Sequence, residues 1–337
     1  MAVGIRALRM VQIGQEVSAG GTTDPASTIW RGEGMLKDNR VTTFPTENIG
    51  IIGGVNRTYV GKTGGEIELT GIATYEQLPY IFNAGFYLSA PTTDAGSESI
   101  RTWNVQSAST DPISSSDLQT LVIEGGDNAQ AEIMRYGFVR QFSLSGTVGE
   151  AVNLSATVEG REIGLTTFTA GLSIPTVKDL LMSKAKVYID PSTDAAGTTQ
   201  KSNTLLGFQL DVVTGWKGQD TADGRLDFSF AKRISDEITL QLTFEHETTS
   251  IAQKAAWRAE TEQVIRLRFD GPALATTDSS YDTKTLIMDL YGKWETFDVI
   301  DEQDGNDIVT GTFKVGYSTA ASKKATFIVV NELATLP

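Results

Sequence analysis

The closest approach to a catalytic motif is the stretch NRTYVGKT, Asn56 to Thr63, which ends like a phosphate-binding loop. Such a loop needs a glycine at its first position and a following helix whose N-terminus faces the phosphate. Here Asn56 stands in place of the glycine, and the following GGEIELT has the pattern of a turn and a strand. The sequence therefore favours a hairpin turn over a nucleotide site.

Two other features could do chemistry. The single histidine, His246, lies between two glutamates, where it could act as a base. However, one histidine cannot build a multi-histidine metal site, and no serine or cysteine nucleophile motif accompanies it, so a structural or solvated role is favoured. The run DEQDGND, residues 301–307, contains calcium-type ligands but lacks the spacing and distal glutamate of an EF-hand. We predict a hairpin turn at Asp304 and Gly305.

These motifs nominate no catalytic, cofactor-binding or metal-binding residue, so we expect a protein that is not an enzyme and has no cofactor. Tryptophans could still line a sugar-binding face, although core packing or subunit interfaces are the favoured use. The five tryptophans are Trp30, Trp103, Trp216, Trp257 and Trp294.

The composition suits strands and turns. The chain has 337 residues, of which 40% are hydrophobic, with 33 glycines, 9 prolines and no cysteine. The absence of cysteine excludes disulfides and cysteine-ligated metals. The net charge of −14 opposes stable binding to nucleic acid. We find no signal peptide and no apolar run near the roughly 20 residues of a membrane span, so we expect no membrane partner and a cytoplasm-like environment.

Several segments occur twice. AGGTTDPASTIW (residues 19–30) resembles AAGTTQKSNTLL (residues 195–206), and EIELT (66–70) resembles TLQLT (239–243) at nearly the same offset. Each later match alternates apolar and polar residues, as in a strand with one buried face. Each is followed by a helix signal, one beginning at Thr74 and the other at Ser250. The chain therefore reads as two copies of one unit.

The predicted fold class is mainly β (α+β), with two tandem antiparallel β-sandwich or barrel-like domains that each hold one α-helix. The first domain spans residues 1–165, a linker spans 166–182, and the second domain spans 183–337. The first copy carries an insertion at about 88–117, which we expect to be an exposed hairpin or loop. The segment from 207 to 234 reads as a projecting hairpin suited to reach a neighbouring molecule.

The segments EIELTGIATYEQLPYIFNAGF and ITLQLTFEHETTSIAQKAAWRAETEQVIRLRFDG carry a resemblance to a known family. The order of strands, helix and hairpin resembles the major tail tube protein of long-tailed bacteriophages, with a duplicated tail-tube domain. The resemblance implies a virion structural protein, assembled in the host cytoplasm and located in the phage tail. It implies stacked rings, each of three subunits with pseudo-sixfold symmetry, around a channel that delivers DNA.

The resemblance also implies the partners. They are further copies of the chain through ring closure and ring stacking, the tape measure protein, and the tail terminator and distal tail proteins. Double-stranded DNA would pass through the lumen without stable binding, and no membrane is involved. We expect the 207–234 hairpin and the N-terminal segment to carry contacts between rings.

A size estimate agrees with a channel. If each unit gives four strands to the lining, about 24 strands at about 4.8 Å spacing have a circumference near 115 Å and a diameter of roughly 37 Å. A duplex about 20 Å across fits inside. The alternative is a phage receptor-binding or decoration protein with glycan-binding β-sandwich domains, in which the tryptophans and the 88–117 insertion form the ligand surface.

Overall fold

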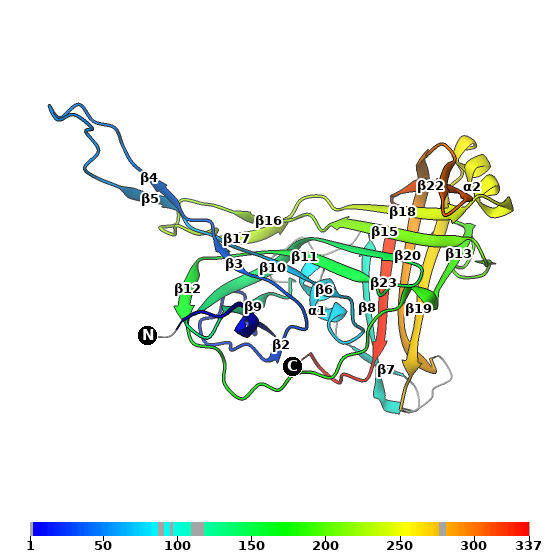
Figure 1. Cartoon of the computed structure of the whole chain (residues 1–337), viewed down its shortest axis with the longest axis horizontal. Helices are drawn as coiled ribbons and strands as arrows, with labels where there is room; N and C mark the ends of the chain where they lie inside the picture. Colours follow the sequence, from blue (N-terminus) through cyan, green and yellow to red (C-terminus); the bar gives the residue numbers. More distant parts are fainter. Residues whose placement is uncertain (1–2, 87–90, 95–96, 109–117, 276–280, 337) are drawn as a thin grey trace.

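The computed structural model describes residues 3–86, 91–94, 97–108, 118–275 and 281–336; for 93–108 it describes the backbone. These residues form mostly antiparallel β-strands with two α-helices, one in each half of the chain (Figure 1). The prediction of a mainly β (α+β) chain is therefore confirmed. Among the described residues, no helix has the length and apolar character needed to cross a membrane.

The central feature is one antiparallel sheet of eight strands that runs through both halves of the chain. Its order is β3-β6-β11-β10-β15-β18-β22-β20, so that four strands come from each half. The strands are β3 (Leu36–Asp38), β6 (Gly65–Ile72), β11 (Asn153–Gly160), β10 (Ala131–Thr147), β15 (Leu205–Val213), β18 (Glu237–Glu245), β22 (Asn306–Val315) and β20 (Thr283–Phe297).

Two further sheets lie against this one, because β10 and β20 are long enough to belong to two sheets each. The first part of β10 pairs with β9 (Leu121–Gly126) and β12 (Ile163–Thr166), and β9 continues to β1 (Met10–Gln15) and β2 (Thr28–Ile29). The first part of β20 pairs with β19 (Gln263–Ala273) and β23 (Lys323–Asn331), and β19 continues to β13 (Ala185–Pro191) and β14 (Gln200–Lys201). A short strand, β21 (Asp301–Gln303), pairs with the start of β22.

The core lies between the layers and follows from the alternation of apolar residues along each strand. Helix α1 (Leu78–Gly85) is buried along its whole length. Its ring Phe82 packs 5.5 Å from Phe142 on β10 and 5.1 Å from Phe327 on β23, measured between ring centroids. The helix therefore joins the first half of the chain to the second.

Both helices begin near the predicted positions but not at them. Helix α1 begins at Leu78 instead of Thr74, because Thr74 to Gln77 form a turn in which Gln77 N donates to Thr74 Oγ1 at 3.3 Å. Helix α2 (Thr248–Arg258) begins two residues before the predicted Ser250, because Glu247 caps it and pairs with Ser250 in a capping box.

The repeated Gly-Thr-Thr segments lie in corresponding turns, between β1 and β2 and between β13 and β14. In the second turn, Asp190 accepts hydrogen bonds from the backbone N–H groups of Gly197, Thr198 and Thr199, at 3.0, 3.0 and 2.8 Å. In the first turn, Glu16 accepts one from Gly20 at 2.8 Å. A carboxylate therefore holds each turn in shape.

The described part of the 88–117 insertion is a hairpin, as predicted, but it belongs to a sheet. Its strands β7 (Thr92–Asp94) and β8 (Ser97–Ala108) pair with each other. Strand β8 also pairs with β23 from the second half, from Lys323↔Ala108 to Asn331↔Arg101. The rest of the insertion lies outside the described residues.

The predicted projecting hairpin at 207–234 is divided differently in the structure. Residues up to Val213 belong to β15, which is paired on both sides in the central sheet. The hairpin that follows, β16 (Trp216–Gln219) with β17 (Phe230–Arg233), lies over the first half of the chain.

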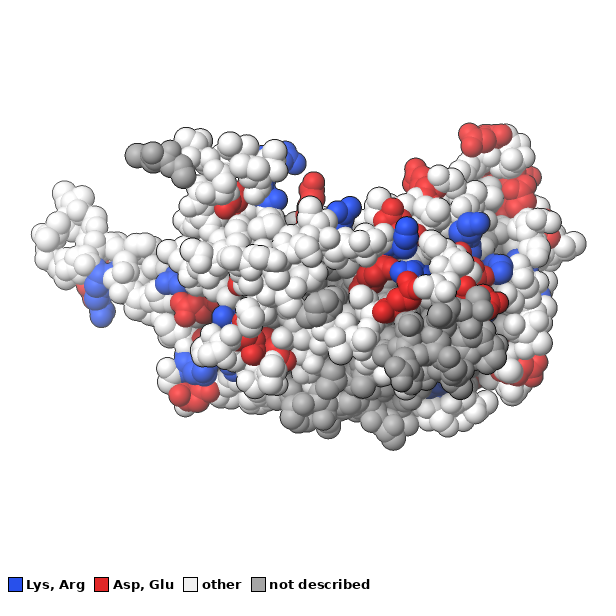
Figure 2. Space-filling model, turned by 90° about the horizontal axis from the view of Figure 1, so that it is seen from below, with Lys and Arg blue, Asp and Glu red and all other residues white. Residues whose placement is uncertain are grey.

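A different hairpin projects from the molecule. Strands β4 (Val41–Thr43) and β5 (Tyr59–Lys62) pair and extend past the end of the body (Figure 1). We call residues 41–62 the arm. Figure 2 shows that the arm carries few charged side chains on the face seen from below.

Candidate functional site

The two halves match each other in pairing register, including one irregularity. Strand β10 has a bulge between Val139 and Gln141, opposite β11. Strand β20 has a bulge between Trp294 and Thr296, opposite β22. The bulged residues are therefore Arg140 in the first half and Glu295 in the second. Because bulges are specific features of a strand, a matched bulge makes the two positions structurally equivalent.

The halves meet edge to edge where β10 pairs with β15, from Gln141↔Val213 to Thr147↔Gly207. We call this contact the seam. At its end, the backbone N–H of Thr214 donates to the backbone oxygen of Arg140 at 3.0 Å. The Thr214 side chain is fully buried and donates to Val139 O at 2.7 Å. The seam is therefore a hydrogen-bonded strand contact that is buried at the Thr214 end.

One end of the eight-stranded sheet is the open edge of β3. Leu36 faces Ile67 on β6, as Leu210 on β15 faces Leu240 on β18. This register makes Arg40, four residues after Leu36, equivalent to Thr214. No described strand pairs with the outer side of β3. There the Arg40 N–H donates to the nearby side chain Asp38 Oδ1 at 2.9 Å.

The other end of the sheet is the outer edge of β20 beyond Gly292. This edge also has no strand partner among the described residues. Its bulged residue, Glu295, offers its backbone oxygen to Trp257 Nε1 on α2, which donates at 3.0 Å. Arg40 N is equivalent to Thr214 N, and Glu295 O is equivalent to Arg140 O. The groups that would repeat the seam hydrogen bond therefore lie at opposite ends of the sheet. Each of them makes a hydrogen bond to a nearby side chain instead.

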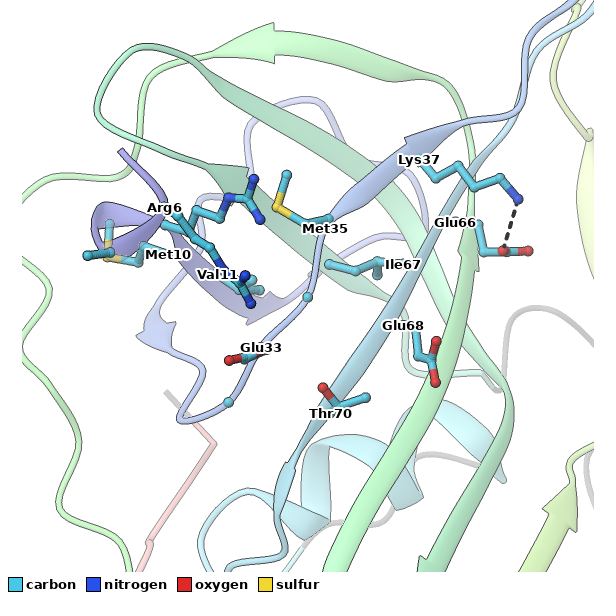
Figure 3. A pocket seen from close by; sticks show the side chains of 14 residues that line it. Arg6, Met10, Val11, Glu33, Met35, Lys37, Glu66, Ile67, Glu68 and Thr70 are labelled. Carbon is cyan, nitrogen blue, oxygen red and sulfur yellow. Dashed lines mark ion pairs between the residues drawn. The ribbon is translucent and has the colours of Figure 1, made fainter. Parts of the chain in front are cut away.

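A groove of about 1060 Å³ lies beside the open edge of β3 (Figure 3). Its walls are the N-terminal segment around the short 3-10 helix η1 (Arg6–Leu8), the chain from Gly32 to Lys37, and β6. The side chain of Met35 is 49% exposed there.

The charges around the groove are mixed. Arg6 and Arg9 lie on the N-terminal wall, and Lys37 pairs with Glu66 at 3.6 Å. Glu68, on the same strand as Glu66, accepts a hydrogen bond from Ser155 Oγ at 2.9 Å. Such a surface suits a polypeptide backbone with side chains of both charges better than a single small ion.

One face of the eight-stranded sheet is polar, and the other is buried. A single row of paired residues crosses six strands: Thr70, Ser155, Ser143, Asp211, Thr239 and Lys314. These side chains are exposed or half-buried, whereas the neighbouring row holds buried residues such as Leu69 and Phe142. Acidic side chains on the polar face outnumber basic ones; they are Glu66, Glu68, Glu159, Asp211, Glu237 and Glu245, against Lys37, Lys293 and Lys314.

The features singled out in the sequence do not come together in space as a reaction centre. Residues 56–63 lie in the arm and β5, followed by strand β6 as predicted. His246 lies between β18 and α2, where its backbone N–H donates to Asp307 O at 2.9 Å. The predicted turn at Asp304 and Gly305 is confirmed, with φ values of 54° and 83° between β21 and β22. Within the described residues, no three His, Asp or Glu side chains gather as metal ligands.

Three of the tryptophans, Trp30, Trp216 and Trp294, are at most 5% exposed. Trp257 lies half-buried on α2, with its ring centroid 6.0 Å from that of Phe297. The side chain of Trp103, on β8, lies outside the described residues. The described tryptophans therefore serve packing, in line with the favoured interpretation of the sequence.

No pattern in the sequence points directly to the seam or to the two open edges. Alternation of apolar residues identifies a strand and its buried face, but does not name the strand beside it. The repeat is an indirect signal for the open edges. When two equivalent units join through one edge of each, the first unit keeps one edge unpaired and the second unit keeps the other.

The chain matches no protein-family model and no curated protein. Its function is therefore inferred from the geometry above.

Proposed function

We propose that this protein is a virion structural protein that forms the tail tube of a long-tailed phage. In this proposal the chain holds two tandem tail-tube domains, and copies join edge to edge into closed rings that stack around a DNA channel. The observation that supports it best is the seam, because the chain already contains one copy of the contact that ring closure requires.

The proposed contact between chains repeats the seam with its two open edges. The end of β20 and the residues after it, Thr296 to Val299, in one copy pair with Leu36 to Asn39 in the next, in the register of β10 with β15. The Arg40 N–H then donates to Glu295 O, as Thr214 N–H donates to Arg140 O within the chain. Closure also removes both unpaired edges, which otherwise invite uncontrolled association.

The size estimate is supported by the sheet. Each half contributes four strands to the eight-stranded sheet, which is the number that the estimate assumed for the channel lining. In the proposed ring, the polar face lines the channel. This face carries mostly hydroxyl, amide and carboxylate groups and few cationic side chains. DNA phosphates therefore find few partners there, and the DNA passes without being bound.

Cysteine cross-linking tests the proposal, because the natural chain has no cysteine. Asn39 and Thr296 are exposed and equivalent to Val213 and Gln141, which face each other in the seam. We expect the Asn39→Cys/Thr296→Cys variant to form disulfides between chains, ending at a closed trimer on a non-reducing gel, with rings or tubes in electron micrographs.

Two variants serve as controls. Gln141→Cys/Val213→Cys should form its disulfide within one chain, and Asn39→Cys/Thr310→Cys should form none, because Thr310 lies on an inner strand. Persistent monomers without cross-links in the test variant would overturn the proposal. A receptor-binding or decoration protein would behave in that way, although the burial of Trp30, Trp216 and Trp294 removes three residues from its expected ligand surface.

A further inference from the structure

The arm and the β16–β17 hairpin occupy equivalent places in the two halves. The arm lies between β3 and β6, and the β16–β17 hairpin lies between β15 and β18. Their internal registers also agree, since Thr42 faces Val60 where Trp216 faces Arg233. The offset in residue number from Thr42 to Trp216, and from Val60 to Arg233, is nearly the same as the offset between the equivalent flanking strands. The two hairpins are therefore equivalent elements in different surroundings.

The β16–β17 hairpin is packed across the seam onto the first half. Trp216, Phe228 and Ala231 are at most 3% exposed and form a cluster with Tyr136 and Phe138 of β10. The ring of Phe228 lies edge-on to Tyr136, with centroids 5.1 Å apart. The hairpin thus clasps the neighbouring unit in addition to the strand pairing of the seam.

A cation completes this contact. The guanidinium of Arg161 lies 4.3 Å from the centroid of the Tyr136 ring. Its nitrogens donate to the backbone oxygens of Phe228 and Ser229, at 3.1 and 2.5 Å. Arg161 therefore links the first half to the backbone of the hairpin.

The second half carries a similar surface on β20, and no hairpin of the described residues covers it. By the register of the matched bulges, Lys293 on β20 is equivalent to Phe138. Tyr291 lies two residues before Lys293, as Tyr136 lies two residues before Phe138, and it is 5% exposed. The ammonium of Lys323 lies 5.8 Å from the centroid of the Tyr291 ring, as Arg161 lies over Tyr136. Lys293 is exposed, and the nearby Tyr317 is 42% exposed.

The arm exposes apolar side chains, as expected of a hairpin whose packing partner lies on another chain. Phe44 and Tyr59 are 60% and 56% exposed, in contrast to the buried residues of the β16–β17 hairpin. The arm points away from the second half, in the same direction in which β16–β17 extends over the first half (Figure 1). Exposed apolar side chains on a projecting hairpin are typical of an interaction surface.

We propose that the arm of one copy packs onto the second half of the next copy, over Tyr291, Lys293, Tyr317 and Lys323. This inference rests on the proposed function and adds a second contact between the same two chains. The Lys323 ammonium donates to backbone oxygens of the arm, in the role that Arg161 has within the chain.

A bis-maleimide cross-linker with a short spacer tests this contact in the full chain. Thr42→Cys/Lys293→Cys should cross-link between chains, because Thr42 and Lys293 are equivalent to Trp216 and Phe138, which share one cluster. Asn39→Cys/Thr296→Cys is the parallel measurement for the edges. Cross-linking of the edges without cross-linking of the arm overturns the arm contact alone, and failure of both overturns the proposed function as well.

An arm-deleted variant gives an independent readout. Replacing residues 41–62 by a short Gly-Ser turn is compatible with the fold, because Asn39 N donates to Gly64 O at 2.8 Å at the base of the arm. We expect unchanged thermal unfolding of the monomer and a loss of about tenfold or more in edge cross-linking, from one lost interface cluster. Lys323→Met should act in the same direction. Rings that form as readily without the arm would overturn the proposal.

Discussion

Lys284 Nζ lies 2.6 Å from Glu76 Oε1, and this buried ion pair joins the first half of the chain to the second. Glu76 lies just before α1, and its other carboxylate oxygen accepts a hydrogen bond from Lys178 N at 2.7 Å. Lys284 lies on β20 and also contacts Glu332 at 3.2 Å. One cluster of charges therefore ties together both halves and the segment that links them.

Loss of one partner should leave a buried charge without compensation. We expect Lys284→Met to lower the free energy of unfolding by about 3–5 kcal/mol, because Glu76 then stays desolvated. Urea unfolding followed by fluorescence measures the change. The double variant Lys284→Met/Glu76→Gln should recover most of the loss. A single-variant effect below about 1 kcal/mol would contradict a coupling role for this pair.

The same cluster predicts how stability depends on pH. A hydrogen bond from Ala275 N lowers the pKa of Glu332, so the stability it contributes is lost as the pH falls below about 4.5 and through the lowered value. Burial opposes the charge of Lys284, but hydrogen bonds to Glu76 and Glu332 raise its pKa. Its contribution is therefore lost only as the pH rises above about 10.5. Glu332→Gln should flatten the acid limb of the unfolding profile and weaken the alkaline limb only in part, because Glu76 still raises the pKa of Lys284.

Trp257 holds the edge oxygen of Glu295 that the proposed contact between chains requires. Trp257→Phe keeps an aromatic ring beside Phe297 and removes the N–H donor. We expect the critical concentration for assembly to fall by about 2- to 10-fold, the equivalent of one hydrogen bond of about 0.5–1.5 kcal/mol that no longer has to be broken. Light scattering against protein concentration measures it, with Arg258→Lys on the same helix as the control. A higher critical concentration would show that Trp257 supports the contact instead of competing with it.

The charge of the polar face should decide whether DNA is held. Glu68 and Asp211 are exposed on this face, in different halves of the chain. Glu68→Lys/Asp211→Lys should still assemble, but the tubes should retain double-stranded DNA about tenfold more strongly at low salt, and less so as salt rises. Co-sedimentation measures retention. Asp194→Lys/Glu260→Lys makes the same change in net charge at turns away from the sheet; equal retention by both variants would argue against a lining role for the polar face.

Local patterns in the sequence predicted individual elements well. Leu240, Leu242 and Phe244 alternate with polar residues, and all three are buried on β18 as expected. The turn at Asp304 and Gly305 was also predictable, because these residue types tolerate positive φ. Helix α2 begins earlier than expected, because Glu247 supplies the cap and the sequence offered several capping residues in a row.

Relationships between distant strands were not predictable in the same way. The 207–234 segment has the alternation of a hairpin, yet its first part is a central strand, because it pairs with β10, which lies far from it in the sequence. The pairing of the insertion was equally unpredictable, since its strand β8 pairs with β23 near the other end of the chain. A strand pattern carries no information on which partner lies beside it, so the seam and its two open edges required the structure.

The two halves that meet at the seam belong to one chain, and this covalent connection limits the number of units in a closed ring. In the proposed ring, every chain would supply its two units together, so the ring would always hold an even number of units. Rings of five or seven units are excluded by connectivity, whatever angle the interface adopts. In the proposed tube, joining two units in one chain would thus halve the number of association steps per ring. It would also prevent rings with an odd number of units.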